Sequence, residues 1–266
     1  MKRFDYKDKV AIITGASSGI GKALAGELIK RYNCTVFAIA RNEERLRLAK
    51  EELGDLYVPY PMDATSKEGW QELRDFLKKS DTPPDILINC AGVLPKFEPF
   101  LKSGSEKLLE VISINLMAGV YGCEAFMPIM NEGSIVINIA SSSALCPFGL
   151  VSAYSASKAA FERFSEALAC ESTRISVTTA LPGFVKTDIM RGQNPSQREK
   201  SLIDKFSADA DKVAKKILAK ARKRKRRTVI GFDAKLMDFM YKHFPNSAPK
   251  MISSFLKKSG LALFAQ

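Results

Sequence analysis

The chain has few of the residues that build metal centres and disulfide frameworks. Its 266 residues include one histidine and five cysteines. The cysteines are odd in number and scattered, and none pairs with another at a metal-binding spacing: Cys34, Cys90, Cys123, Cys146 and Cys170. We therefore expect no disulfide bridges and no metal in the functional site, and we favour a reducing compartment.

The sequence also lacks the usual targeting and membrane-spanning segments. The N-terminus, Met1 to Asp5, has no apolar core of signal-peptide length. No apolar run reaches the roughly 18 residues that span a bilayer. We expect a cytoplasmic protein, with peripheral contact at a membrane surface left open. His243 is the only base for a Ser-His-Asp hydrolase, and the absence of a Gly-x-Ser-x-Gly elbow disfavours that class.

The stretch from Val10 to Gly21 joins an apolar run, a glycine-rich turn and the start of a helical pattern. Glycine lacks a Cβ atom, so such a turn can be tight and phosphates can approach its backbone. The N-terminus of the helix offers free N–H groups and the positive end of its dipole. Strand, turn and helix together predict a dinucleotide site. Its candidate residues are Gly15, Ser17, Ser18, Gly19, Ile20 and Gly21.

Apolar segments and helical patterns alternate along the rest of the chain. Buried strands are predicted over 10–13, 35–40, 56–62, 85–89, 134–139, 175–181 and 228–231, and further helices over 42–53, 66–79, 107–130, 153–172 and 209–227. This alternation predicts an α/β fold, a Rossmann-type doubly wound parallel sheet of about seven strands with helices on both faces. We expect one dinucleotide-binding and catalytic domain over 1–231 and an amphipathic helical appendage over 232–266.

Four motifs in this order resemble the short-chain dehydrogenase/reductase family in its single-domain form. The first is the spacing Thr14-Gly15-x-x-x-Gly19-x-Gly21. The second is Asn89-Cys90-Ala91-Gly92, in which cysteine replaces the second Asn of the family's Asn-Asn-Ala-Gly turn. The third is Tyr154-x-x-x-Lys158, with Ser141 at the family's usual interval of 13 residues before the tyrosine. The fourth is Pro182-Gly183-x-Val185-x-Thr187.

The resemblance implies roles for further residues. Asp63 would hold the adenine amine, and Asn115 would be the active-site asparagine that holds a water near Lys158. Val185 and Thr187 would face the nicotinamide amide, with hydride transfer at the 4-pro-S face. The implied cofactor-binding set also includes Asn89, Ala91, Gly92, Tyr154, Lys158, Pro182 and Gly183. Members of the family commonly form dimers or tetramers through two long helices, so the resemblance implies a homodimer or homotetramer.

The chemistry of Tyr154 and Lys158 can be argued from the residues alone. They are four apart on a predicted helix and share one face. A tyrosine with a pKa near 10 acts as a base at neutral pH only if that pKa falls by about three units. A lysine ammonium and a positively charged nicotinamide ring shift it in that direction. Ser141 can donate a hydrogen bond to a carbonyl oxygen, although its choice over Ser142 and Ser143 depends on the family interval.

The end of the second predicted strand points to the cofactor. NAD enzymes place an acid there, about 20 residues after the glycines, to bind the ribose hydroxyls. This chain has Arg41 at that place. Arginine can pair with a 2′-phosphate, which an acid would repel. We therefore predict NADP(H).

Apolar residues flank the catalytic positions in sequence: Val93, Leu94, Leu145, Phe148, Leu150, Phe184, Ile189 and Met190. We expect an NADPH-dependent oxidoreductase that interconverts a ketone and a secondary alcohol on a small apolar carbonyl or hydroxy substrate, with a hydroxysteroid or lipid-like ketone as the leading class. Two alternatives stay open. One is a 3-oxoacyl-[acyl-carrier-protein] reductase, and the other is a non-catalytic NADP-binding sensor.

The net charge of +12 is concentrated in the run from Lys212 to Arg227. We expect a solvated helix face there, with an anionic membrane or an acidic carrier protein as the alternatives. Aromatic residues do not interleave the run, so specific nucleic-acid binding is disfavoured. In the appendage, two amphipathic helices are expected, and Met240, Phe244 and Phe255 are predicted to complete an apolar wall of the substrate pocket beneath the covering segment 188–207.

Overall fold

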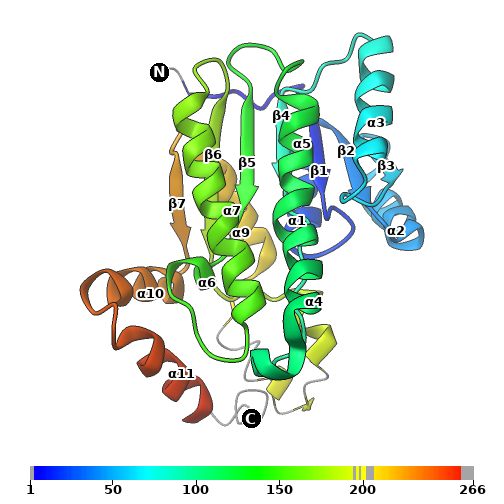
Figure 1. The fold of residues 1–266 in the computed structure, drawn as a ribbon. Helices are drawn as coiled ribbons and strands as arrows, with labels where there is room; N and C mark the ends of the chain where they lie inside the picture. Colours follow the sequence, from blue (N-terminus) through cyan, green and yellow to red (C-terminus); the bar gives the residue numbers. More distant parts are fainter. Residues whose placement is uncertain (1–2, 194–195, 198, 202–206, 259–266) are drawn as a thin grey trace.

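The structure, a computed structural model, describes residues 3–193, 196–197, 199–201 and 207–258. Its centre is a seven-stranded, all-parallel sheet in the order β3-β2-β1-β4-β5-β6-β7 (Figure 1). The strands are β1 Val10–Thr14, β2 Thr35–Ala40, β3 Tyr57–Pro61, β4 Ile86–Asn89, β5 Ile135–Ile139, β6 Ser176–Pro182 and β7 Arg227–Ile230. The predicted doubly wound parallel sheet is therefore confirmed.

Helices cover both faces of the sheet (Figure 1). One face carries α1 Gly19–Tyr32, α2 Glu43–Leu53 and α9 Ala210–Ala221. The other carries α3 Lys67–Lys79, α5 Ala118–Phe126 and α7 Ser152–Glu171. A short helix, α6 Ser142–Leu145, follows β5 and was not predicted. Beyond β7, α10 Phe232–His243 and α11 Ala248–Lys258 lie at one end of the molecule.

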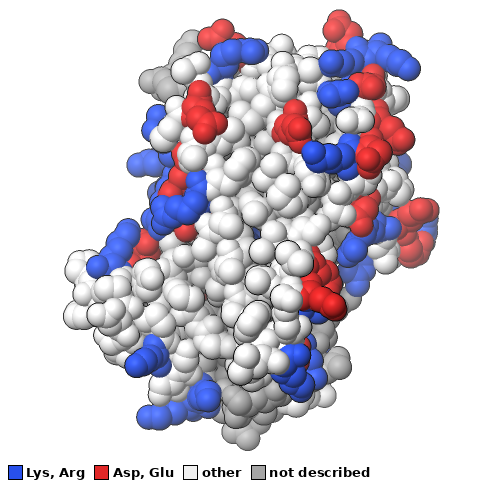
Figure 2. Space-filling view, in the orientation of Figure 1, with Lys and Arg blue, Asp and Glu red and all other residues white. Residues whose placement is uncertain are grey.

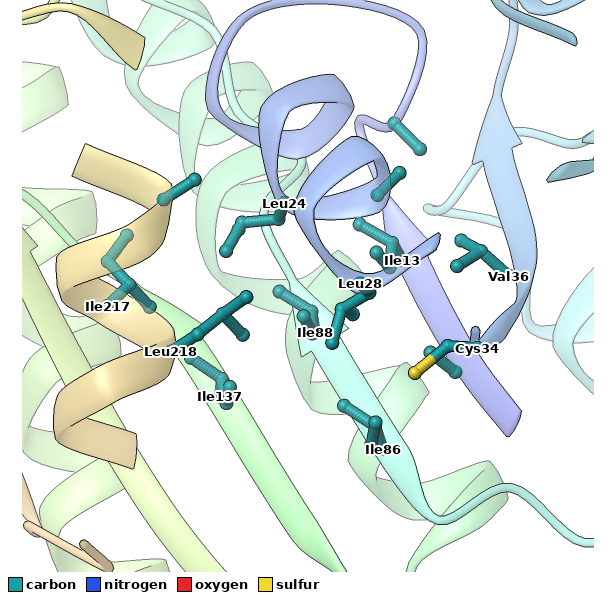
Figure 3. Packing of buried hydrophobic residues seen from close by; sticks show 14 of the residues in the cluster. Ile13, Leu24, Leu28, Cys34, Val36, Ile86, Ile88, Ile137, Ile217 and Leu218 are labelled. Atoms are coloured by element: carbon teal, nitrogen blue, oxygen red, sulfur yellow. The ribbon is translucent and has the colours of Figure 1, made fainter. Parts of the chain in front are cut away.

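The larger core cluster lies between the sheet and the α1–α9 pair. Figure 3 shows Leu24 and Leu28 of α1 with Ile217 and Leu218 of α9, packed over Ile13, Ile88 and Ile137 of the central strands. All these side chains are at most 1% exposed. Because strands buried on both faces are apolar at most positions, the apolar runs in the sequence were a sufficient signal for the sheet.

The long helix predicted over 107–130 differs from the structure in bounds and shape. It comprises α4 Phe100–Ile112, a π-helical turn over Ser113–Met117 and α5. Gly104 has φ 72° and kinks α4 near its start. The composite helix Phe100–Phe126 has a mean hydropathy of 1.3 over its most apolar 18-residue window, of which 39% is buried, so it is apolar and long enough to cross a membrane. Here it packs within the fold, against α7 and α3.

Three other expectations were wrong in detail. In α2 and α3, the helical spacing of the apolar residues predicts that Leu48 and Phe76 face the core, but they are 49% and 54% exposed. The helix predicted over 209–227 ends at Ala221. Beyond it, Arg222 donates to the backbone carbonyl of Phe4 and Arg224 to that of Gly133. Part of the basic run therefore forms hydrogen bonds within the fold.

Two acidic residues fasten α10 to the domain. The Asp233 carboxylate accepts a hydrogen bond from the backbone N–H of Phe184 at 2.6 Å, just after β6. Arg227 on β7 bonds both Asp238 of α10 and Glu162 of α7 at 2.9 Å. Because Glu162 is only 1% exposed, this arginine supplies the charge that a buried carboxylate requires.

Candidate active site

A cavity of about 490 Å³ lies where the strands end at their carboxyl termini. The strand order reverses between β1 and β4, and in such sheets this switch point opens a crevice between neighbouring loops. The cavity brings together nearly all the residues predicted from the motifs: Gly15, Ser17, Ser18, Gly19, Ile20, Gly21, Arg41, Asp63, Ala91, Gly92, Ser141, Tyr154, Lys158, Pro182, Gly183, Val185 and Thr187.

The glycine turn has the geometry that its sequence predicts. Gly15 and Gly19 have φ of 67° and 53°, which other residues rarely adopt. A Cβ atom on Gly21 would lie 2.2 Å from the carbonyl oxygen of Gly15, so only glycine fits where α1 leaves the turn. Ser18 occupies the N-cap of α1 without capping it through its side chain. The first N–H groups of α1 therefore remain available to an anion.

Two arginines border the cavity beyond β2. Arg41 lies 4.0 Å from Asp63, and Arg45 in the first turn of α2 lies 3.8 Å from Asp188. Sequence reasoning named Arg41 and missed Arg45, although a second arginine four residues later was a usable signal. Asp63 also accepts hydrogen bonds from the backbone and hydroxyl of Thr65, both at 2.9 Å, which fix its carboxylate.

Ser141 and Tyr154 form the polar part of the cavity. Ser141 begins α6, and its Oγ accepts hydrogen bonds from the N–H and the hydroxyl of Ser143, at 3.2 and 3.0 Å. With its acceptor sites filled, the Ser141 hydroxyl proton is free to donate elsewhere. Burial raises the pKa of Tyr154, and a hydrogen bond with Ser141 opposes that rise. Burial outweighs the hydrogen bond, so in the protein alone the pKa of Tyr154 lies above its ordinary value.

Lys158 lies one helical turn beyond Tyr154 and is 3% exposed. Its Nζ donates to the carbonyl oxygen of Ile139 at 3.0 Å, at the end of β5. Burial lowers the pKa of this ammonium to about 8. A Cβ atom on Gly92 would be 3.2 Å from Nζ, so a side chain at this position would press on the lysine.

Asn115 lies in the π-helical turn, a type of irregularity that often marks functional sites. It does not line the cavity directly. Its amide donates to the Val93 carbonyl and to Ser157 Oγ, both at 3.0 Å, and accepts from the Val93 N–H at 2.7 Å. The side chain thus holds the loop after β4 against α7, beside Lys158.

The structure does not bring Asn89 into the cavity, although its motif placed it in the cofactor set. Its amide donates to Asn138 Oδ1 at 2.9 Å inside the core. The backbone N–H groups of Cys90 and Ala91 instead bond Thr14 Oγ1 at 3.0 Å, which joins the loop after β4 to the end of β1. Cys90 replaces the family's second asparagine and lines the cavity. Burial raises the pKa of its thiol to about 11, so the thiol is uncharged at neutral pH.

Apolar side chains form much of the cavity wall: Val93, Leu94, Phe97, Ile114, Phe148, Phe184 and Ile189. Of these, Leu94, Phe97 and Phe148 pack in one cluster with Tyr154. Leu145 and Leu150 pack behind this wall instead, and the side chain of Met190 lies outside those described. Phe244 and Phe255, expected in the wall, are 55% and 68% exposed. The inner side of α11 supports the wall from behind, where Ile252 and Leu256 pack on the cluster of Phe97, Phe148 and Tyr154.

A buried glutamine that the sequence did not reveal fixes the segment after β6. Gln193 belongs to the 3₁₀ helix Asp188–Gln193 and is 6% exposed. Its amide donates to the Pro95 carbonyl at 2.7 Å and accepts from the Phe97 N–H at 2.8 Å. The segment after β6 is thereby tied to the loop after β4. Residues 194–195, 198 and 202–206 of the predicted cover lie outside the described residues.

Comparison with known proteins agrees with this geometry. The family model described as short chain dehydrogenase matches residues 9–198. An uncharacterized oxidoreductase of Staphylococcus aureus is 34% identical over 200 residues, covering 73% of this chain and 85% of that protein. The human protein named inactive hydroxysteroid dehydrogenase-like protein 1 is 32% identical over 194 residues, covering 69% of this chain and 58% of that protein.

Solved structures share the fold. A short chain dehydrogenase from Burkholderia cenocepacia in complex with NADP has a TM-score of 0.77 at 24% identity, covering 92% of this chain and 97% of its own. One from Burkholderia phymatum in complex with NAD has a TM-score of 0.80 at 23% identity, covering 90% and 94%. With a family model that spans most of the sequence, the chain belongs to the short-chain dehydrogenase family.

Proposed function

We propose that the protein is an NADPH-dependent oxidoreductase that interconverts a ketone and a secondary alcohol on an apolar substrate. The observation that carries this proposal is the grouping of Tyr154, Ser141 and Lys158 beside a glycine turn and under an apolar wall. The bound cofactor would supply or accept the hydride. Its diphosphate would lie at the N-terminus of α1, whose first N–H groups the Ser18 side chain leaves uncapped.

The chain's own residues would handle the proton and the developing charge. In reduction, the hydroxyl groups of Ser141 and Tyr154 both donate to the carbonyl oxygen and stabilise the charge that it gains. Tyr154 then gives up its proton to that oxygen, and its raised pKa in the protein suits a proton donor. Lys158, with a pKa of about 8, can be charged or neutral near neutral pH and can return a proton to the tyrosine. Asn115 positions the loop beside Lys158.

The choice of NADP(H) rests on Arg41 and Arg45, both at the rim of the cavity. A 2′-phosphate would accept hydrogen bonds from one or both guanidinium groups. Arg41→Asp should therefore lower kcat/KM for NADPH by about 100-fold or more while NADH loses little, because an acid repels the phosphate and accepts from the ribose hydroxyls. Steady-state kinetics with both cofactors measures this. Equal losses with NADPH and NADH would contradict the assignment.

The reaction itself is tested by a screen of NADPH oxidation over steroid, acyl-thioester and small ketones. We expect turnover with an apolar ketone and a loss of about 1,000-fold or more in kcat for Tyr154→Phe, with NADPH binding retained. An acyl-carrier-protein thioester as the preferred substrate would favour the carrier-protein reductase instead. NADPH binding without turnover on any ketone would favour the non-catalytic sensor, a possibility raised by the name of the human relative.

A further inference from the structure

The outer sides of α10 and α11 form an apolar surface that the described part of the chain leaves uncovered. Its members are between 45% and 83% exposed: Phe232, Leu236, Phe239, Phe244, Met251 and Phe255. We call these six residues the apolar face. Phe232, Leu236 and Phe239 recur at helical spacing and so share one side of α10. Figure 2 shows a broad uncharged surface in this part of the molecule with lysine and arginine at its borders.

The charges on these two helices are arranged by sign. All their lysines are exposed: Lys235, Lys242, Lys250, Lys257 and Lys258. The two acids of α10 are directed into the protein, Asp233 to the Phe184 N–H and Asp238 to Arg227. Helix α11 contains no acid. The outward charge of the pair is therefore positive. Within the described ranges, Lys242 is the one lysine of these helices that pairs with a carboxylate, that of Asp238.

This combination fits a lipid surface better than a protein partner. Phenylalanine and leucine at the centre of an interfacial helix, with lysines beside them, match the apolar interior and anionic headgroups of a bilayer. Lysine stems can lie along the apolar surface while their ammonium groups reach the phosphates. Protein interfaces, in contrast, are depleted in lysine.

The inner sides of the same helices adjoin the candidate active site. Ile252 and Leu256 pack on the cluster that contains Phe148 and Tyr154. Ser253 Oγ accepts a hydrogen bond from the Gly149 N–H at 3.0 Å. On α11, each exposed residue of the apolar face directly precedes one that packs on this cluster: Met251 before Ile252, and Phe255 before Leu256. Adjacent residues are about 100° apart on a helix, so the apolar face and the contact with the cavity wall are neighbouring sides of α11.

We propose that α10 and α11 dock the protein on an anionic lipid bilayer, with the apolar face inserted among the headgroups and the lysines on lipid phosphates. Docking places the apolar wall of the cavity beside the lipid, so that a membrane-dissolved substrate can reach Tyr154 without crossing water. This last step rests on the proposed function, whereas bilayer binding does not.

Sedimentation of the full chain with vesicles tests the docking, without substrate or cofactor. We expect binding to vesicles of phosphatidylcholine with phosphatidylserine, weakened by salt, and little binding to phosphatidylcholine alone. Lys250→Gln/Lys257→Gln/Lys258→Gln should lower the partition coefficient about fivefold per lysine, or roughly 100-fold in total. Phe239→Ser/Phe255→Ser should reduce binding to a similar degree by removing the inserted rings.

Matched variants control for charge and for exposed apolar area. Lys215→Gln/Lys216→Gln/Lys220→Gln removes the same charge from α9, and Leu48→Ser/Phe76→Ser removes exposed apolar side chains from α2 and α3. Both should bind vesicles like the unaltered protein. Absence of binding to the anionic vesicles, or equal losses in the α9 variant, would overturn the proposal. So would a change in oligomeric state of Phe239→Ser/Phe255→Ser without a change in vesicle binding, which would assign the face to a second copy.

A kinetic measurement separates the docking from the chemistry. With a bulky ketone dissolved in anionic vesicles, Phe239→Ser/Phe255→Ser should lower the rate, while a small soluble ketone is reduced as before. Vesicle binding without any ketone reduction would contradict the proposed function and leave the docking supported. If Phe239→Ser/Phe255→Ser reduces each ketone at the same rate as the unaltered protein does, the proposed entry of substrate from the lipid is wrong.

Discussion

The orientation of one hydroxyl group depends on a neighbour that the motif does not include. Ser143 donates both its N–H and its O–H to Ser141 Oγ. A hydroxyl that already accepts two hydrogen bonds can direct its own proton to a substrate oxygen. Ser143 is therefore a positioning residue, and two of the three adjacent serines have distinct tasks.

Ser143→Ala should lower kcat about fivefold with little change in KM for NADPH, because one hydrogen bond that orients Ser141 is lost while its backbone N–H remains. Steady-state kinetics on the substrate found in the ketone screen measures this. Ser155→Ala removes a buried hydroxyl that has no hydrogen-bond partner in the described structure, and it serves as the control. Equal effects of the two substitutions would show that only packing is disturbed.

Lys158 ties stability to pH. Its pKa is about 8 in the folded chain against 10.5 as the ordinary value. Below pH 8 both states are protonated, and the folded state carries the cost of a buried charge. Between pH 8 and about 10.5 the unfolded state binds more protons, so this residue makes stability rise with pH, by about 3 kcal/mol in all.

Lys158→Met should therefore raise the free energy of unfolding near pH 7 and remove the rise above pH 8. Urea unfolding of both proteins between pH 7 and 10 measures the difference, and the contributions of the tyrosines that titrate above this range cancel in the comparison. A constant difference between the two proteins across that range would contradict the lowered pKa.

At the scale of the elements, Gln193 ties the 3₁₀ helix after β6 to the loop after β4. Gln193 spans from this helix to Pro95 and Phe97 with two hydrogen bonds. Gln193→Met keeps the length of the side chain and loses both bonds, so KM for the ketone should rise about tenfold. Gln197→Met, a substitution at an exposed glutamine of the same segment, should have no effect. An increase in KM for NADPH of the same size would argue for a general loosening of the loop instead.

The features that the sequence predicted well depend on residues close together in the chain, through strand composition and helical spacing. Strands buried on both faces are mostly apolar, and Tyr154 and Lys158 are neighbours on any helix. Sequence reasoning failed where the distant chain decides. Gln193 meets residues nearly a hundred positions away, Asp233 bonds Phe184, and neither contact has a periodic pattern. The predicted burial of Leu48 and Phe76 was wrong for a related reason. Helical spacing shows which side of a helix faces the core, but it does not show how much of the helix circumference the core covers.

For the whole molecule, α4 offers a surface for self-association. Leu101 and Leu109 are 95% and 65% exposed on a helix of the kind through which the family forms dimers. We expect a homodimer or homotetramer in solution, and Leu109→Lys should shift it toward smaller species by placing charge in an apolar contact. Light scattering at micromolar concentration measures both, with Leu48→Lys on α2 as the control. A monomeric unaltered protein would rule out this surface as an interface.

The two prolines of β3 have a consequence at the free edge of the sheet. The carbonyl of Leu56 and the N–H of Met62 bond to β2. Because backbone groups alternate in direction along a strand, the N–H and C=O positions of residues 57, 59 and 61 point away from β2, toward the free edge. Pro59 and Pro61 occupy two of these outward positions and have no N–H to donate. An approaching strand would find acceptors and almost no donors along this border. The protein is thereby protected from hydrogen-bonded pairing of this edge strand with the edge strand of another molecule, whatever surface its helices use to associate.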